Sequence, residues 1–556
     1  MNKKVCSFPI LFALLALVIG TCAVVFPASA QAAPTSTGSI TVSGTVASSY
    51  DAYQIFSANV VDGDSDAKIA TDLAWASDAA RDAVLPVLHS AGMPNSQTTA
   101  QEAAEWLNTD SHLTSALSAQ LARSLQSSGA VFVALNAGTT AELPCGYWLI
   151  VADDDAIAQG EVGTAPIMAL VGGSAVTVKP KAATPKVSKH VLEDSTAAWQ
   201  KAADATVADD LYWRLSATVP AGLTAYDTYT VRFVDTMSAG LDPSKVAASM
   251  RVYAAAGADG GFDAVSTGKD GHAGTEPAKG WTDITAQCAT KVAADSKTFT
   301  VRTGDLIAAL GGADAFTAGA RVVAVYNAPL NSACNHGIAK GNPNEVYLRY
   351  PRSPFADQSG DAGFTSTPSD DACAYTWDLA LTKRGSDGDK PLAGAVLSIA
   401  DDRGRTLAAD GTWDAEGKAT VTTGEDGRVT VSGVDSGKLE VRELKAPKGY
   451  TAFQGMRSVT VKAGGLDVDQ VAAAKSKLTI TAESPLRADS ADGSTGSLEA
   501  SLINTPTGTP PSITTGGFMP STGDMAMYAA AAAAVAGAAL IVVALLVKRG
   551  GGSHKE

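Results

Sequence analysis

The chain has 556 residues, of which 46% are apolar, and a formal net charge of -15. This acidic balance argues against a nucleic-acid-binding protein, because such proteins present basic patches to the phosphates. The six histidines are scattered without metal-ligand spacing, and the acidic run 62–66 is followed by alanine and leucine where a calcium loop needs glycine and glutamate. We therefore expect neither a metal nor a cofactor.

Both ends of the chain carry apolar runs. The basic start "MNKK", an apolar stretch and the small-residue site "ASA" predict a secretory signal peptide over residues 1–30, in preference to a membrane anchor. Residues 525–547 are long enough to span a bilayer as a helix, and a basic tail, 548–556, follows them as expected for a cytoplasmic end. A buried core helix is the alternative for this second run.

Residues 38–179 are predicted to form a first domain. "SITVSGTV" and "DAYQIFSANV" alternate as strands do, and "GYWLIVAD" returns to that pattern. Between them, residues 99–127 have helical spacing, so the domain is expected to be a sheet structure with a helical insertion. The proline-containing stretch 180–185 is predicted to be a linker.

Two further domains are expected at 186–372 and 373–507. Both are rich in Thr, Val and Tyr with glycine-containing turns, which is typical of antiparallel β sandwiches. Residues 508–518 are a Pro/Gly/Thr linker that has no means of forming a core. The predicted fold class is therefore mainly β, with tandem sandwiches of which the first has a helical insertion.

Polar residues stand at matching places in the core-facing rows of these two domains. Side chains two apart share one face of a strand, so an ionisable residue in such a row is expected to be buried. Each domain has one lysine, one acid and one asparagine so placed. The two sets are Lys189, Asp235 and Asn344 in the second domain, and Lys383, Glu443 and Asn504 in the third.

Burial would give these residues an unusual chemistry. A buried lysine sheds its proton and becomes a nucleophile, and a buried carboxyl stays neutral and can polarise an amide carbonyl. Holding amine and amide in contact can supply an effective molarity of about 10⁵ to 10⁸ M. The product would be a Lys–Asn isopeptide bond, formed with loss of ammonia. The alternative is that each polar residue marks the point where its strand emerges into water.

The C-terminal end carries a five-residue motif followed by the apolar run and the basic tail. This order resembles the cell-wall sorting signal of Gram-positive bacteria, usually Leu-Pro-x-Thr-Gly, with methionine here in place of leucine. The resemblance implies that a sortase cleaves after the threonine and transfers it to an amine of peptidoglycan or of another copy. The motif is Met519, Pro520, Ser521, Thr522 and Gly523.

The segment "VTVKPK" at 176–181 bears on which amine is used. It resembles the pilin motif of sortase-built pili, a strand ending in Tyr-Pro-Lys, although Lys179 stands in place of the tyrosine. The resemblance implies that Lys181 is the acceptor, with Lys179 as the next candidate. The alternative is that Lys181 is an ordinary solvated lysine of a linker.

"LEVRELKAPKGY" resembles the E-box of the self-crosslinking Ig-like domains of pilins and collagen-adhesin stalks; Leu439 and Leu444 depart from that pattern. "FVDTMSAGL" and "GNPNEVYLRY" resemble the Asp-bearing and Asn-bearing segments of a pilin middle domain. The resemblance implies Ig-like folds, a Lys189–Asn344 bond assisted by Asp235, and a Lys383–Asn504 bond assisted by Glu443. No bond is expected in the first domain, where Ala152 takes the place of the acid.

Taken together, these features predict a structural shaft subunit of a surface pilus rather than an enzyme. Thr522 of one copy would be joined to Lys181 of the next, and the polymer would be anchored to the cell wall and support adhesion. The expected partners are pilus-class and housekeeping sortases, other copies, ancillary pilins, peptidoglycan and a host surface ligand. The alternative is a singly anchored adhesin or an ancillary pilin.

Four cysteines lie outside the signal region, and an exported protein can pair them. Four cysteines allow three connectivities. The sequence favours a disulfide between Cys334 and Cys373, which flank one strand and its following loop.

Overall fold

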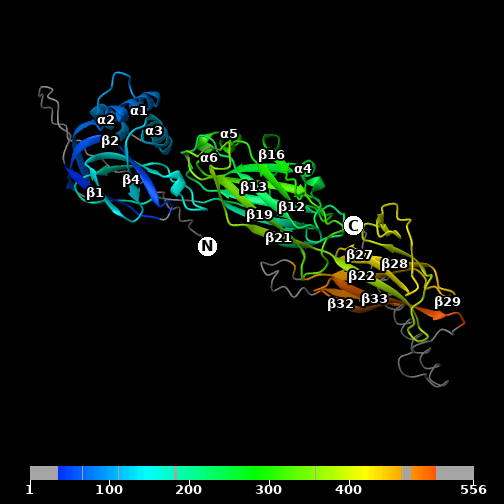
Figure 1. The fold of residues 1–556 in the computed structure, drawn as a ribbon. Coiled ribbons are helices and arrows are strands. Elements are labelled where there is room, and N and C mark those ends of the chain that lie inside the picture. The colour runs from blue at the N-terminus through cyan, green and yellow to red at the C-terminus, as the bar shows by residue number, and fades with distance from the viewer. Residues whose placement is uncertain are drawn as a thin grey trace, which may run out of the picture.

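The computed structural model describes residues 36–508, except 45, 65–66, 110–111, 181–183, 224, 357, 465 and 467–477. The signal peptide, Lys181, the sorting motif and residues 525–547 lie outside the described residues. None of the helices in the described part of the chain is long and apolar enough to span a membrane. Figure 1 shows three regions in a row, which we call the N-terminal region (36–180), the middle region (184–375) and the C-terminal region (376–508).

The N-terminal region contains two sheets and the helical insertion. One sheet has the order β5-β1-β8, and the other has the order β3-β2-β6-β7, with β4 added beside β2. Apolar residues of β2 and β6 alternate between a core shared with the first sheet and a core shared with the helices. The strands are β1 (Thr37–Val42), β2 (Ser49–Asp62), β3 (Lys68–Trp75), β4 (Phe132–Asn136), β5 (Thr140–Pro144), β6 (Gly146–Ala152), β7 (Ile167–Val171) and β8 (Val176–Val178).

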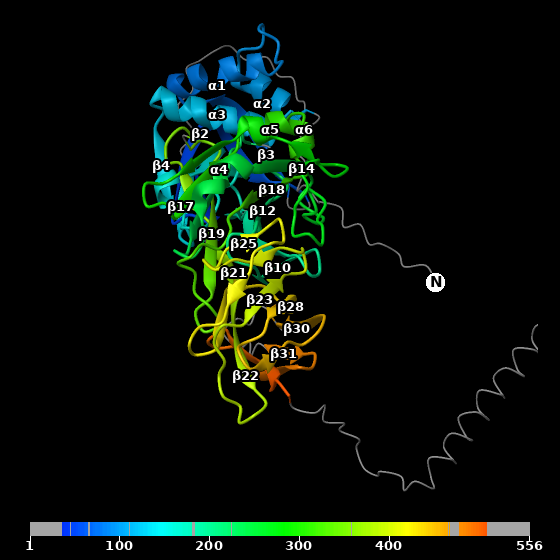
Figure 2. The same cartoon turned by 90° about the vertical axis from the view of Figure 1, so that its right-hand side faces the viewer.

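Three helices lie between β3 and β4: α1 (Asp78–Ser90), α2 (Ala100–Asn108) and α3 (Ser115–Ser128). The predicted helical stretch corresponds to α2 and α3. Thr99 and Glu102 form a capping box that begins α2. Helix α1 was not predicted from the sequence, and it contains Pro86, a residue that usually breaks helical patterns. Figures 1 and 2 both place two short helices of the middle region, α5 (Leu306–Ala309) and α6 (Ala313–Phe316), close to α3.

The middle region is a sandwich of two sheets with one large core between them. The first sheet has the order β10-β9-β12-β18-β14-β15, and the facing sheet has the order β11-β21-β19-β13-β17-β16, with β20 beside β19. The elements are β9 (Lys186–Glu193), β10 (Ala198–Gln200), β11 (Ala202–Asp204), β12 (Tyr212–Val219), β13 (Arg232–Met237), α4 (Val246–Ser249), β14 (Arg251–Ala256), β15 (Thr282–Asp283), β16 (Ala289–Val292), β17 (Thr298–Arg302), α5 (Leu306–Ala309), α6 (Ala313–Phe316), β18 (Ala320–Asn327), β19 (Asn342–Pro351), β20 (Phe364–Ser366) and β21 (Asp370–Tyr375).

The N-terminal region contacts the middle region outside the linker as well. Val162 is buried in the core of the middle region, although it comes from the loop before β7. The hydroxyl of Tyr350 donates to the carbonyl of Gly160 at 2.6 Å, and the Arg123 guanidinium of α3 pairs with Asp227 at 2.7 Å. The loop before β7 and the helical insertion therefore both contact the middle region.

The C-terminal region is a second sandwich. Its first strand, β22, lies parallel to its last strand, β33, in the sheet β27-β22-β33-β29, with β32 beside β33; the facing sheet has the order β25-β24-β23-β28-β30-β31, with β26 beside β23. The strands are β22 (Trp377–Gly385), β23 (Val396–Ala400), β24 (Thr406–Leu407), β25 (Trp413–Asp414), β26 (Val421–Thr422), β27 (Arg428–Val434), β28 (Gly437–Lys445), β29 (Tyr450–Thr451), β30 (Met456–Lys462), β31 (Thr479–Ala482), β32 (Leu486–Asp492) and β33 (Ser497–Pro506).

The predicted fold class is confirmed: the described residues form a mainly β structure of tandem Ig-like sandwiches, with helices inserted in the first region. The alternation that predicted the strands is visible in the burial of β22, where every second residue is buried from Trp377 to Gly385. The division into three separate folding units remains a prediction.

Candidate functional site

Three polar residues predicted from the sequence meet in the core of the middle region. Lys189 on β9, Asp235 on β13 and Asn344 on β19 are all fully buried. The Lys189 ammonium forms a hydrogen-bonded ion pair with Asp235 Oδ2. Because β9 belongs to one sheet and β13 and β19 to the other, this group spans the interior of the sandwich.

Tyr326 on β18 joins this group and was not predicted from the sequence. Lys189 Nζ donates to its hydroxyl at 2.9 Å, and Asn344 Nδ2 donates to the same oxygen at 2.8 Å. The hydroxyl in turn donates to Asp235 Oδ2 at 3.0 Å. The sequence does place Tyr326 at the end of the core-facing row of β18. A tyrosine in such a row is usually a packing residue, so its position alone does not indicate a chemical role.

Burial controls the ionisation of the middle group. It lowers the pKa of Lys189 to about 8, although the charge of Asp235 opposes this shift. Burial also raises the pKa of Asp235, again against the opposing effect of the lysine. Both shifts favour the neutral forms, an amine and a carboxylic acid. The Oδ1 atoms of Asp235 and Asn344 have no hydrogen-bond partner, so the amide carbonyl is open to a donor.

A second group lies in the core of the C-terminal region. Lys383 on β22 and Asn504 on β33 come from one sheet, and Glu443 comes from β28 in the facing sheet. Asn504 Nδ2 donates to both carboxylate oxygens of Glu443, at 2.8 and 3.1 Å. Lys383 Nζ lies 3.5 Å from Glu443 Oε1. The side chains of Lys383 and Glu443 are fully buried, so the structure brings this predicted triad together as well.

The amine of this second group is also shifted towards its neutral form. Burial lowers the pKa of Lys383 to about 8, with Glu443 acting in the opposite direction. The amine donates to the carbonyl of Leu502 at 3.3 Å, and Asn504 Oδ1 has no hydrogen-bond partner. Lys383 is directly paired with Leu502 in the parallel ladder, so Asn504 follows two residues further along the same strand. Side chains two apart on a strand share a face, which brings amine and amide together.

The N-terminal region has a different arrangement at the corresponding strand. Ala152 ends β6 and is buried, and its side chain offers no acid. Lys68 donates to the carbonyls of Gly172 and Ser174, at 2.5 and 2.6 Å, and pairs with Asp62. Lys68 thus holds the loop between β7 and β8 in place through these hydrogen bonds.

The structure contradicts the disulfide favoured from the sequence, because Cys334 and Cys373 are free thiols. The physical reason is that the two side chains pack in different places. Cys334 packs against the core of the middle region and contacts His336, whereas Cys373 belongs to the core cluster of the C-terminal region. Burial raises the pKa of both thiols to about 11, so neither is an activated nucleophile.

The predicted acceptor, Lys181, and the sorting motif lie outside the described residues, and only the approach to Lys181 is described. The backbone N–H of Ser43 donates to the carbonyl of Val178 at 2.8 Å, at the end of β8. The next residue, Lys179, is exposed. Strand β8 therefore carries the chain to the surface immediately before the motif.

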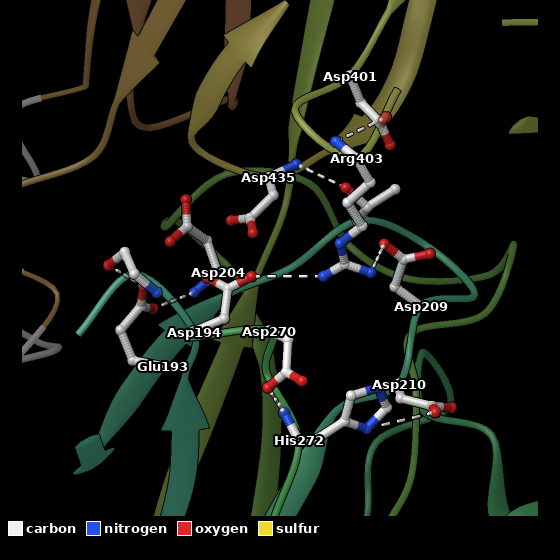
Figure 3. A network of polar contacts seen from close by, with 12 residues as sticks. Glu193, Asp194, Asp204, Asp209, Asp210, Asp270, His272, Asp401, Arg403 and Asp435 are labelled. Atoms are coloured by element: carbon white, nitrogen blue, oxygen red, sulfur yellow. Dashed lines mark hydrogen bonds and ion pairs between the residues drawn. The ribbon is translucent and has the colours of Figure 1, made fainter. Parts of the chain in front are cut away.

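A network of carboxylates lies where the middle and C-terminal regions meet (Figure 3). Asp204 Oδ2 accepts from the Trp377 indole at 2.6 Å and from the backbone N–H of Ser436 at 2.9 Å. Arg403 pairs with Asp194 at 3.5 Å and with Asp209 at 3.0 Å. Arg405 pairs with Asp209 as well, at 2.6 Å. The junction is therefore polar and carries more acids than these two arginines can neutralise. The sequence analysis did not identify this network.

We predict that this junction loses stability as the pH rises. Burial, followed by the charge of Asp204, raises the pKa of Glu193 from its ordinary value of 4.5 to about 7. The folded state thus binds this proton more tightly. Its contribution to stability, on the order of 3 kcal/mol, is complete below about pH 4.5 and is lost as the pH passes about 7. Asp194 and Asp435, whose pKa values burial also raises, act in the same direction, while Arg403 opposes the shift at Asp194.

Thermal unfolding at about pH 5.5 and about pH 8.5 measures this effect. The midpoint of the wild type should be lower at the higher pH, and Glu193→Gln, which imitates the protonated acid, should reduce the difference. Glu345→Gln, at an exposed position on β19, is the control and should leave the difference unchanged. Equal pH dependence in wild type and Glu193→Gln would contradict the prediction.

Part of the chain is similar to known proteins. Residues 378–475 match the model of the SpaA family, a prealbumin-like fold domain. The chain is 31% identical over 134 residues to the trypsin-resistant surface T6 protein of Streptococcus pyogenes serotype M6, a match that spans 23% of either protein.

Two solved structures can be compared over most of the chain. The T6 backbone pilin of serotype M6 Streptococcus pyogenes is 17% identical, with a TM-score of 0.46, over 85% of this chain and 98% of the other. The full-length major pilin SpaD from Corynebacterium diphtheriae is 16% identical, with a TM-score of 0.41, over the same shares. Residues 378–475 of this chain thus match a SpaA prealbumin-like domain, and the chain is similar in part to a streptococcal surface protein.

Proposed function

We propose that this protein is the shaft subunit of a sortase-assembled pilus, stabilised by two intramolecular Lys–Asn isopeptide bonds. The observation that supports the proposal most strongly is the presence of two buried lysine–acid–asparagine groups in two successive sandwiches. A buried lysine beside one acid and one amide is a costly arrangement for stability alone. Finding it twice, with a different topology each time, favours a chemical role.

The contacts support a single-turnover reaction within each sandwich. The neutral lysine Nζ attacks the asparagine Cγ, while the acid in contact with that lysine holds it in place and the amide Oδ1 has no other partner. The Cγ–Nδ2 bond then breaks, Nζ gives up one proton, and ammonia leaves with that proton. In the middle region the new bond would link the two sheets, and in the C-terminal region it would link the first and last strands.

The polymer would be built by a second, intermolecular reaction. A sortase would cleave between Thr522 and Gly523 and transfer Thr522 to Lys181 of the next copy, with peptidoglycan as the final acceptor at the wall. The exposure of Lys179, directly after β8, supports this assignment, because the chain has reached the surface there. The protein itself acts on no substrate, and its partners would be sortases, further copies, ancillary pilins and a host surface ligand.

An immunoblot of boiled cell-wall extract from the native organism tests the proposed polymer. The wild type should give a high-mass ladder, since isopeptide linkages survive boiling, and Lys181→Ala should reduce it to a single band. Lys179→Ala is the matched control and should keep the ladder. A single band in the wild type would favour an adhesin anchored alone. A ladder that survives Lys181→Ala but is lost in Lys179→Ala would move the acceptor to Lys179.

A further inference from the structure

The two triads differ in the length of their acids. Glu443 contacts both reacting groups by itself, because its carboxylate accepts from Asn504 and lies 3.5 Å from Lys383 Nζ. Asp235 is one methylene shorter. Its Oδ2 contacts Lys189 and Tyr326, its Oδ1 has no partner, and it makes no hydrogen bond to Asn344.

The sheet register accounts for the gap between Asp235 and Asn344. Asp235 is paired with Val346 and Asn344 with Met237, so the two residues are diagonal neighbours on adjacent strands. Diagonal neighbours in an antiparallel ladder are about 7 to 8 Å apart, which a short side chain does not span. The hydroxyl of Tyr326 fills this gap, and it lies within 3.0 Å of Lys189 Nζ, Asn344 Nδ2 and Asp235 Oδ2.

We propose that Tyr326 is a catalytic residue of the middle crosslink, which relays a proton from Lys189 to the leaving nitrogen of Asn344. This inference rests on the proposed function, because it assigns a further residue to the same reaction. As Nζ bonds to Cγ, it gives one proton to the Tyr326 oxygen, and the hydroxyl gives its own proton to Nδ2. The Cγ–Nδ2 bond breaks, ammonia leaves, and the tyrosine is returned unchanged.

Two further observations suit Tyr326 to this role. Its ring is fully buried and packs edge-on against Phe299, with centroids 4.8 Å apart and an interplanar angle of 75°, so the hydroxyl is held in place. Burial, together with the charge of Asp235, raises the pKa of the phenol well above its ordinary value. The hydroxyl therefore keeps its proton until the reaction uses it.

The experiment uses intact mass and peptide mapping of the mature chain carrying Tyr326→Phe. This substitution keeps the ring, so the fold is preserved while the relay is lost. General acid–base contributions are typically about 10² to 10⁴ in rate. We therefore expect the purified variant to lack the middle bond and to show a mass deficit of one ammonia rather than two. Tyr229→Phe is the control, because the Tyr229 hydroxyl is buried in the same core without a hydrogen-bond partner.

A double variant separates the relay from a merely structural role. Asp235→Glu lengthens the acid to that of the C-terminal triad, so Tyr326→Phe combined with Asp235→Glu should regain the second ammonia loss. Complete bond formation in Tyr326→Phe, or no middle bond in the double variant, would overturn the inference. If the wild type shows no ammonia loss in the middle region, the proposed Lys189–Asn344 bond itself is wrong. This result differs from a failure of the Tyr326 relay, in which the wild type has the bond.

Discussion

The intact mass of the mature chain is expected to fall short of its sequence mass by two ammonia molecules, one for each buried triad. The reason is that each group places an amine and an amide on one shared partner inside a sandwich and leaves the amide oxygen open; the partner is Tyr326 in the middle region and Glu443 in the C-terminal region. Such confinement replaces an unfavourable bimolecular step by one with an effective molarity of about 10⁵ M or more. Mass spectrometry of the intact chain, with peptide mapping of the linked strands, measures the result directly.

Single substitutions should remove the bonds independently. Lys383→Ala should restore one ammonia and leave the middle bond, and Lys189→Ala should do the reverse. Lys445→Ala, on the same strand as Glu443 but exposed, is the control and should keep both losses. A wild-type chain at its full sequence mass would refute the assignment of both triads.

The second large effect is expected in thermal stability. A covalent link between Lys383 and Asn504 closes a loop of more than a hundred residues in the unfolded chain, which by the entropic treatment of disulfides is worth about 5 kcal/mol. Asn504→Ala should therefore lower the free energy of unfolding of the C-terminal region by about this amount, and its midpoint by about 15 °C. This variant is preferred because it keeps the buried Lys383–Glu443 ion pair and leaves no unpaired charge.

Scanning calorimetry shows whether the loss of stability in Asn504→Ala is confined to the C-terminal region. The transition of the middle region should stay in place in Asn504→Ala, and Asn344→Ala should move that transition instead. Protease resistance gives a second measure, since the crosslinked sandwich should survive trypsin longer than the variant. An unchanged midpoint in Asn504→Ala would show that no bond stabilises the C-terminal region.

The sequence was sufficient to predict the strands and both triads, because they depend on local alternation. Lys383 follows three buried residues in the row from Trp377, and an ionisable residue in such a row is visible without any knowledge of the fold. Tyr326 could not be distinguished in this way, since a buried tyrosine is ordinary and only its three partners, distant in the chain, reveal its role. The acidic junction was missed for the same reason: Asp204 and Ser436 meet only because two regions pack together.

The predicted disulfide was wrong for a different reason. Cys334 and Cys373 were expected to pair because they flank one strand and its following loop, but Cys334 lies in a loop against the middle core and Cys373 packs in the C-terminal core. Helix α1 was missed because Pro86 weakens the local pattern, while Ser77 caps the helix and its buried residues pack in the N-terminal core. In both cases tertiary packing overrode a local signal.

The parallel pairing of β22 and β33 also decides how the C-terminal region would respond to tension. The chain enters along β22 and leaves along β33, so pulling on its two ends loads the whole ladder between these strands in shear. With Lys383 joined to Asn504, the load would pass along β22, cross one covalent bond and leave through the last residues of β33. Residues 384–503 would then lie outside the load path, and the sandwich would transmit force without being able to extend.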